Sequence, residues 1–199
     1  DVLDALRVAY FRELMGIAAR DLTGIYPMEV IAGWLSDLAD ATLNAALAIG
    51  RVGVPHPRTP LAVIAMGKSG GRELNYISDV DVIFVTDESD SINDATQIAR
   101  GLMRACSAVT AEGSIWEVDA ALRPEGKQGA LVRTVESHVG YYERWASTWE
   151  FQALLKARCV AGDPTVGEQY IHGVQPFIWA AADRDGFVTD VQAMRRRVE

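Results

Sequence analysis

Two aspartates inside an apolar run are the feature that most constrains what this chain can fold into. Residues 79–86, DVDVIFVT, predict a buried strand, and residues two apart on a strand face the same side, so Asp79 and Asp81 are expected to lie together. Burying carboxylates is costly unless something neutralises them. Magnesium does so with oxygen ligands, typically one or two carboxylates plus substrate phosphates. The run therefore predicts a metal site on a strand, although the same pattern also occurs at strand starts with two solvated aspartates.

A later stretch offers a third carboxylate. Residues 114–123, SIWEVDAALR, alternate and predict a third strand, whose core face would consist of Trp116, Val118, Ala120 and Leu122. The opposite face would carry Glu117, Asp119, Ala121 and Arg123. Asp119 would join the first two aspartates in a two-metal site for in-line displacement at phosphorus, and Arg123 would meet phosphate charge. Glu117 is either a fourth acidic ligand or an ion-pair partner of Arg133.

A glycine-rich turn directly follows the apolar run at residues 61–66. Its sequence is GKSGG, and its members are Gly67, Lys68, Ser69, Gly70 and Gly71. Glycines let a backbone approach a phosphate closely, and successive N–H groups form an anion-binding nest. The serine hydroxyl and the lysine charge would add to such a site. The order of residues is neither a Walker loop nor G-x-G-x-x-G, and a tight turn without a ligand is the alternative.

Periodicity divides the rest of the chain into helical and mixed parts. Apolar residues recur at helical spacing up to Ile17, and a second helix is predicted to begin at Pro27 and to stop at Gly50. A loop rich in proline follows at residues 53–60. A helix stripe is predicted from Ile98 to Val109, and everything after residue 134 reads as helical, including residues 187–199.

These elements predict an α+β fold with a small mixed sheet of about four or five strands, flanked by N-terminal and C-terminal helices. We expect a helical segment at residues 1–53, a core at residues 54–134 and a second helical segment at residues 135–199. The aromatic residues at 141–151 are interpreted mainly as packing, and both cysteines, Cys106 and Cys159, as buried small residues in helices.

Composition excludes several classes of protein. Asp and Glu outnumber Lys and Arg by 27 to 19, which argues against a generic nucleic-acid binder with a basic face. No apolar run approaches the length of a membrane span, and no secretory signal is visible. The two cysteines form neither a disulfide framework nor a zinc motif, which favours a reducing compartment. We therefore expect a cytoplasmic protein that binds neither nucleic acid nor membrane, and both chain ends suggest a piece of a larger protein.

Three motifs together carry a family resemblance. The order of glycine turn, D-x-D strand and later strand carboxylate resembles the polymerase-beta-like nucleotidyltransferases. More narrowly, AMGKSGGRELNYISDVDVIFV, EVDAALRPEGKQGALVRT and YYERWASTWEFQALLKARCVAGD are similar to bacterial glutamine synthetase adenylyltransferases, which add and remove AMP. The resemblance is dense over residues 60–165 and looser in the flanking helices.

The resemblance implies roles for individual residues. Asp79 and Asp81 fall on the D-x-D metal ligands of the family, Asp119 on its third carboxylate, and Gly70 and Gly71 on its phosphate-contacting glycine pair. Implied cofactors are two Mg²⁺ ions, with Mn²⁺ as an alternative, and implied nucleotides are ATP and ADP. Two positions depart from the family pattern: Ser69 stands where leucine is common and Ala121 where arginine is common, which leaves the details of phosphate binding open.

The resemblance also implies partners, namely glutamine synthetase and, through the full-length enzyme, the PII signalling protein. In the family that the chain resembles, the N-terminal half of the enzyme removes AMP from a glutamine synthetase tyrosine by phosphorolysis and releases ADP. The segments GRELNYISDVD and WEFQALLKAR favour that half. Two alternatives stay open: the half that transfers AMP from ATP to the tyrosine, and a regulatory module that binds nucleotide without turnover.

Overall fold

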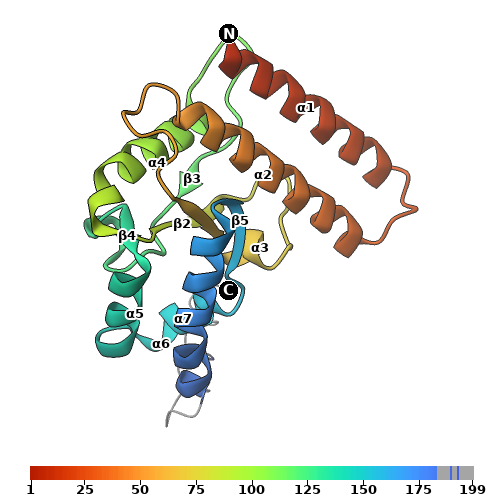
Figure 1. Cartoon of the computed structure of the whole chain (residues 1–199). Coiled ribbons are helices and arrows are strands. Elements are labelled where there is room, and N and C mark those ends of the chain that lie inside the picture. The colour runs from red at the N-terminus through yellow and green to blue at the C-terminus, as the bar shows by residue number, and fades with distance from the viewer. Residues whose placement is uncertain (183–188, 190–191, 193–199) are drawn as a thin grey trace.

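The fold is a five-stranded mixed sheet between two groups of helices (Figure 1). The structure is a computed structural model that describes residues 1–182, 189 and 192. The strands are β1 (Ala62–Ala65), β2 (Val80–Thr86), β3 (Val118–Asp119), β4 (Val132–Thr134) and β5 (Arg158–Gly162). The described helices are α1 (Val2–Asp21), α2 (Met28–Gly50), α3 (Gly67–Gly70), α4 (Ile92–Ser107), α5 (Val135–Arg144), α6 (Thr148–Leu154) and α7 (Pro164–Ala182). The α+β class expected from the sequence is confirmed, and the last predicted helix, at residues 187–199, lies outside the described residues.

Strand β2 is the centre of the sheet. The order is β3-β2-β1-β5, and β4 also pairs with β2. Strand β1 runs antiparallel to both β2 and β5, whereas β3 and β4 run parallel to β2 along the same edge. Strand β3 pairs with the beginning of β2 and β4 with its end. This register sets Asp81 directly opposite Asp119.

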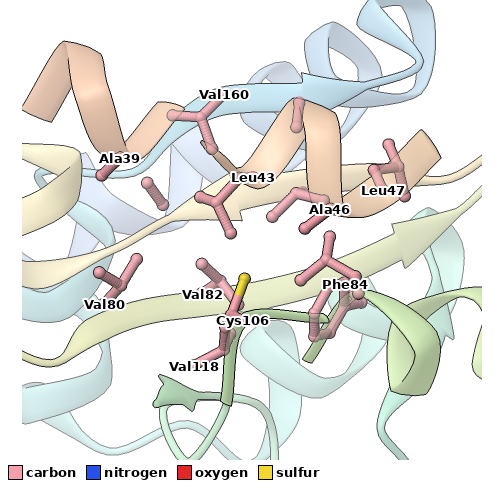
Figure 2. Packing of buried hydrophobic residues seen from close by; sticks show 14 of the residues in the cluster. Ala39, Leu43, Ala46, Leu47, Val80, Val82, Phe84, Cys106, Val118 and Val160 are labelled. Carbon is pink, nitrogen blue, oxygen red and sulfur yellow. The ribbon is translucent and has the colours of Figure 1, made fainter. Parts of the chain in front are cut away.

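Alternating side chains of the central strands enter two separate cores. Val82 and Phe84 of β2 belong to the cluster under α2 and α4, and Ile83 and Val85 to the cluster under α5, α6 and α7. Figure 2 shows the first cluster, in which Leu43 and other residues of α2 lie over β2. A strand covered on both faces reads as a continuous apolar run, which is why β1 and β2 were predictable.

The boundary expected near residue 53 falls in the loop between α2 and β1. Residues on both sides of this loop share one buried cluster: Leu43 and Ala46 of α2 are fully buried in the same core as Val63 of β1 and Val82 of β2. Helix α2 is therefore packed on the sheet itself, with α1 lying outside it (Figure 1).

Three sequence predictions about secondary structure are wrong. The third strand comprises only Val118 and Asp119, not residues 114–123. Residues 158–162 are a strand rather than helix, because they pair with the open edge of β1, and so Cys159 lies half-buried in a strand. Helix α4 ends at Ser107, which leaves Val109 83% exposed. The buried Arg7 guanidinium donates to the carbonyls of Ala105 and Ala108 and so caps that helix end.

The aromatic residues at 141–151 divide between core and surface. Tyr142 and Phe151 are buried, as the packing interpretation requires, whereas Trp145 and Trp149 are exposed. Among the described residues, no helix combines the length and the apolar character needed to cross a lipid bilayer.

Acidification should destabilise the protein through His138. This side chain of α5 is buried against the rings of Tyr142 and Tyr170, and its Nδ1–H donates to the Thr134 carbonyl oxygen at 3.0 Å. Burial lowers its pKa from 6.5 to about 4. The unfolded chain therefore binds a proton at His138 more readily than the folded protein does. The contribution of the neutral side chain to the free energy of unfolding is complete above pH 6.5 and falls by about 3 kcal/mol in all as the pH drops towards 4.

Chemical denaturation at a series of pH values measures this effect. The variant His138→Gln should show a shallower loss of unfolding free energy between pH 6.5 and 4 than the wild-type protein. His172→Gln, at an exposed position of α7, serves as the control and should keep the wild-type slope. Equal slopes in all three proteins would refute the assignment.

Candidate active site

The glycine turn is held against the beginning of β2 at the point where the turn starts. The Met66 N–H donates to the Asp81 carbonyl oxygen at 2.9 Å, which ties the end of β1 to the beginning of β2. Gly67 has a φ of +52°, and a Cβ there would lie 2.6 Å from Asp81 Oδ2. Glycine is needed at this position both for its backbone conformation and because the carboxylate occupies the space of a side chain.

The other two glycines pack against the segment that leads into β5. A Cβ on Gly70 would lie 2.0 Å from the Lys156 carbonyl oxygen and 2.7 Å from that of Ala65. The amides of Gly70 and Gly71 donate to Met66 and Gly67 within the turn. The backbone contacts give Gly70 a structural reason to be glycine, and the contact of the glycine pair with phosphate stays a prediction.

Two further residues of the turn differ in their exposure. Lys68 is exposed, and its charge opposes the rise in the pKa of Asp81. Ser69 is buried, and its hydroxyl has no hydrogen-bond partner among the described residues. A buried hydroxyl of this kind is a costly feature, so a ligand that accepted its hydrogen bond would relieve a penalty.

Two of the three predicted carboxylates lie side by side. Asp81 and Asp119 are opposed in adjacent parallel strands, both half-buried, while Asp79 is exposed just before β2 begins. Burial raises the pKa of Asp81, and the charges of Asp119 and Asp79 raise it further. Asp119 Oδ1 accepts the Ala121 N–H at 2.7 Å. The structure thus brings the three side chains within electrostatic reach of one another.

The donor set fits a hard cation but does not form a closed cage. In residues 1–182, 189 and 192, no three Asp, Glu, His or Cys side chains lie close enough to hold one ion together. The paired carboxylates provide oxygen donors whose mutual repulsion a divalent cation would relieve, and the exposed Asp79 lies just ahead of β2. This chemistry suits Mg²⁺ completed by substrate phosphates.

Comparison with known proteins gives this arrangement a family. A sequence model described as glutamate-ammonia ligase adenylyltransferase matches residues 1–172. The chain belongs to this family. The bifunctional glutamine synthetase adenylyltransferase/adenylyl-removing enzymes of Streptomyces coelicolor and Streptomyces avermitilis are 59% and 58% identical to it, over 97% and 98% of this chain. The enzyme of the same name from Mycobacterium avium is 52% identical over 98% of this chain.

The chain spans about a fifth of the length of these adenylyltransferases. The aligned part amounts to 20% of each of the three relatives. The family match thus covers most of this chain and only one portion of its relatives.

Arg123, which the sequence predicts to meet phosphate, has other partners in this adenylyltransferase family member. Arg123 donates to the carbonyl oxygens of Ala120, Lys127 and Gly129 at 2.6, 3.0 and 3.1 Å. It therefore holds the loop that follows β3, and its contact with phosphate stays a prediction. Arg133 pairs with Glu125 rather than with Glu117, which is exposed.

Sequence reasoning gave no sign of the ion pairs that brace the glycine turn from outside. Arg158 of β5 forms an ion pair with Asp40 of α2, and Arg72 forms one with Asp37 of the same helix. Asp40 and Arg158 are 118 residues apart, so no local pattern links them. Spacing along the chain gave no signal for the first pair, because it arises only when α2 packs over the start of β5.

Proposed function

We propose that this chain is the nucleotidyltransferase domain of an enzyme that removes AMP from adenylylated glutamine synthetase by phosphorolysis. The observation that carries the proposal is the opposed pair Asp81 and Asp119 beneath a glycine turn, in a chain whose relatives are named adenylyltransferase and adenylyl-removing enzymes. The glutamine synthetase of those names is the proposed protein substrate, and PII the proposed regulator of the full-length enzyme.

The reaction exchanges one phosphorus–oxygen bond for another. An oxygen of inorganic phosphate attacks the phosphorus of AMP-tyrosine, the bond to the tyrosine oxygen breaks, the tyrosine regains a proton, and ADP is released. Magnesium, when bound, supplies charge neutralisation at the transferred phosphoryl group. Asp79, Asp81 and Asp119 would hold it, and the protein otherwise acts by positioning the reactants and by matching their charge.

The remaining residues of the site have separate tasks in this proposal. Lys68, whose charge acts on Asp81, adds positive charge where phosphate would enter. The Ser69 hydroxyl, buried and without a hydrogen-bond partner among the described residues, would donate to a phosphate oxygen that reached it. In the other reaction, in which the tyrosine attacks the α-phosphate of ATP, Asp119 would help the tyrosine hydroxyl to lose its proton.

The same residues would serve the addition of AMP to the tyrosine, and the names of the relatives contain both activities. The second candidate is therefore transfer of AMP from ATP to the glutamine synthetase tyrosine with release of pyrophosphate. A regulatory module that binds nucleotide without turnover is the third.

Paired assays separate these candidates. The full-length protein is incubated with Mg²⁺, inorganic phosphate and adenylylated glutamine synthetase, and in parallel with ATP and unmodified synthetase. A version with Asp79, Asp81 and Asp119 replaced by Asn identifies turnover that belongs to this domain. Loss of ADP formation alone supports AMP removal here, and loss of tyrosine modification alone supports the transfer reaction. Full retention of both activities, with nucleotide still bound, would leave only the regulatory module.

A further inference from the structure

The guanidinium of Arg158 forms hydrogen bonds with two separate parts of the protein, helix α2 and the glycine turn. Its Nη1 donates to Asp40 Oδ2 at 2.5 Å and its Nη2 to Asp40 Oδ1 at 3.2 Å. The same Nη2 donates to the Ser69 carbonyl oxygen at 3.1 Å, and Nε donates to that of Gly70 at 3.4 Å. One side chain from β5 therefore joins the glycine turn to helix α2.

The turn needs such a partner because of its own geometry. Helix α3 is a single turn, so the carbonyls at its end lack partners within the helix, and that of Ser69 accepts the N–H of Arg72, which follows the helix, at 3.3 Å. The planar guanidinium of Arg158 supplies donors to two of these carbonyls, and the carboxylate of Asp40 fixes the orientation of the guanidinium plane. Since Arg158 pairs with Ala65 in the sheet, the guanidinium stands on a rigid element.

A second ion pair acts on the residue after the turn. Arg72 has a φ of +58°, a left-handed conformation that is unfavourable for a side chain other than glycine. Its guanidinium donates to Asp37 Oδ1 and Oδ2 at 2.6 and 2.9 Å. Asp37 and Asp40 are three residues apart, so they share a face of α2. Helix α2 thus carries an anion for each of the two arginines that touch the turn.

We propose that Arg158, oriented by Asp40, is a positioning residue that sets the glycine turn for phosphate binding. This inference rests on the proposed function, since it takes the turn to be the phosphate site. Arg158 acts through the Ser69 and Gly70 carbonyls and not on the substrate, because its donors are already engaged by the turn and by Asp40. Helix α2, which precedes the sheet in the sequence, thereby helps to shape the site.

The decisive variant is Arg158→Lys in the full-length enzyme. A lysine keeps the charge but cannot reach a carboxylate and two carbonyls with one planar fork. The KM for inorganic phosphate in AMP removal, or for ATP in AMP transfer, should rise about tenfold with kcat within about threefold, because a misplaced turn weakens ground-state and transition-state binding alike. Asp40→Asn should change the same KM in the same direction by a smaller factor.

Arg51→Lys is the matched control. Arg51 also donates to two loop carbonyls, those of Pro57 and Thr59 at 2.6 and 2.9 Å, but ahead of β1, at the opposite end of the strand from the glycine turn. It should lose stability without a change in KM. In the double variant Asp40→Arg with Arg158→Asp, the ion pair returns while the carbonyls face an aspartate. If the double variant is as stable as the wild type but keeps a raised KM, the result supports the positioning role of Arg158. If both stability and KM return to wild-type values, Arg158 contributes only an ion pair and the proposal is overturned.

Hydrogen exchange tests the same idea without turnover. The amides of Gly70 and Gly71 are bonded within the turn, so a peptide covering residues 66–72 should exchange faster in Arg158→Lys than in the wild type or in Arg51→Lys. An unchanged rate in that peptide would overturn the proposal even if both enzymes are active. If the wild type shows neither activity, the proposed function fails, while the exchange result still decides whether Arg158 holds the turn.

Discussion

Replacing Asp81 with asparagine should lower the rate of AMP removal or transfer by roughly a thousandfold or more, while the protein stays folded. The amide keeps the shape of the side chain but cannot provide the negative charge that the paired carboxylates present to a cation. In the absence of a cation, burial and the neighbouring Asp119 and Asp79 raise the pKa of Asp81. Above that raised pKa the ionised carboxylate opposes folding, and below its ordinary value of 3.8 the opposition disappears. At neutral pH the free energy of unfolding of the variant should therefore equal or exceed that of the wild type.

Activity and thermal unfolding are measured together for this variant. Mg²⁺ should raise the Tm of the wild type, because it binds the folded carboxylate pair, and should raise that of Asp81→Asn much less. Asp90→Asn, in the exposed segment after β2, is the control for loss of a carboxylate and should match the wild type in both measurements. Wild-type rates in Asp81→Asn would end the catalytic interpretation of this site.

Replacing Gly70 with alanine should destabilise the protein by at least about 4 kcal/mol. The added methyl group would lie 2.0 Å from the Lys156 carbonyl oxygen and 2.7 Å from that of Ala65. Both obstacles are backbone atoms, one of them in β1, so neither can move aside as a flexible side chain would. The turn would have to separate from the sheet, and its contact with Arg158 would be lost.

Gly140→Ala is the matched control for this substitution. Gly140 lies within α5, and a Cβ there would meet nothing within 4 Å. Since alanine favours a helix over glycine, this variant should gain up to about 1 kcal/mol. Urea denaturation compares the two variants with the wild type, and a Gly70→Ala protein as stable as the wild type would show that the turn is not packed as described.

The sequence predicted the parts of the fold that local pattern controls. Strands β1 and β2 are apolar runs buried on both faces, and α1 and α2 follow helical spacing to within a few residues. Strand β5 was read as helix because only its pairing with β1, from far along the chain, makes it extended. Strand β3 was predicted too long because alternation continues beyond the two residues that find a partner on β2.

The residues of the candidate site likewise divide into those that a local pattern predicts and those that only the packing of distant segments brings together. The position of Asp119 beside Asp81 follows from alternation within two strands, and so the sequence could predict it. The commitment of Arg123 to loop carbonyls depends on the course of residues 120–129, which no periodicity describes. The brace formed by Asp40 and Arg158 depends on how a helix before the sheet packs on a strand at its far edge. The roles of these residues in binding metal and phosphate stay predictions.

The directions of the strands place the whole candidate site at one end of the sheet. Asp81, Asp119, the glycine turn and Arg158 all lie at the same end of the sheet, because β1 leads out of that end where β2 and β5 enter it. Helices cover both faces of the central strands, because the side chains of β2 alternate between the cluster under α2 and α4 and the cluster under α5, α6 and α7 (Figure 1). We therefore expect a protein substrate of the proposed reaction to present its tyrosine at this end of the sheet, where the paired carboxylates and the braced turn lie together.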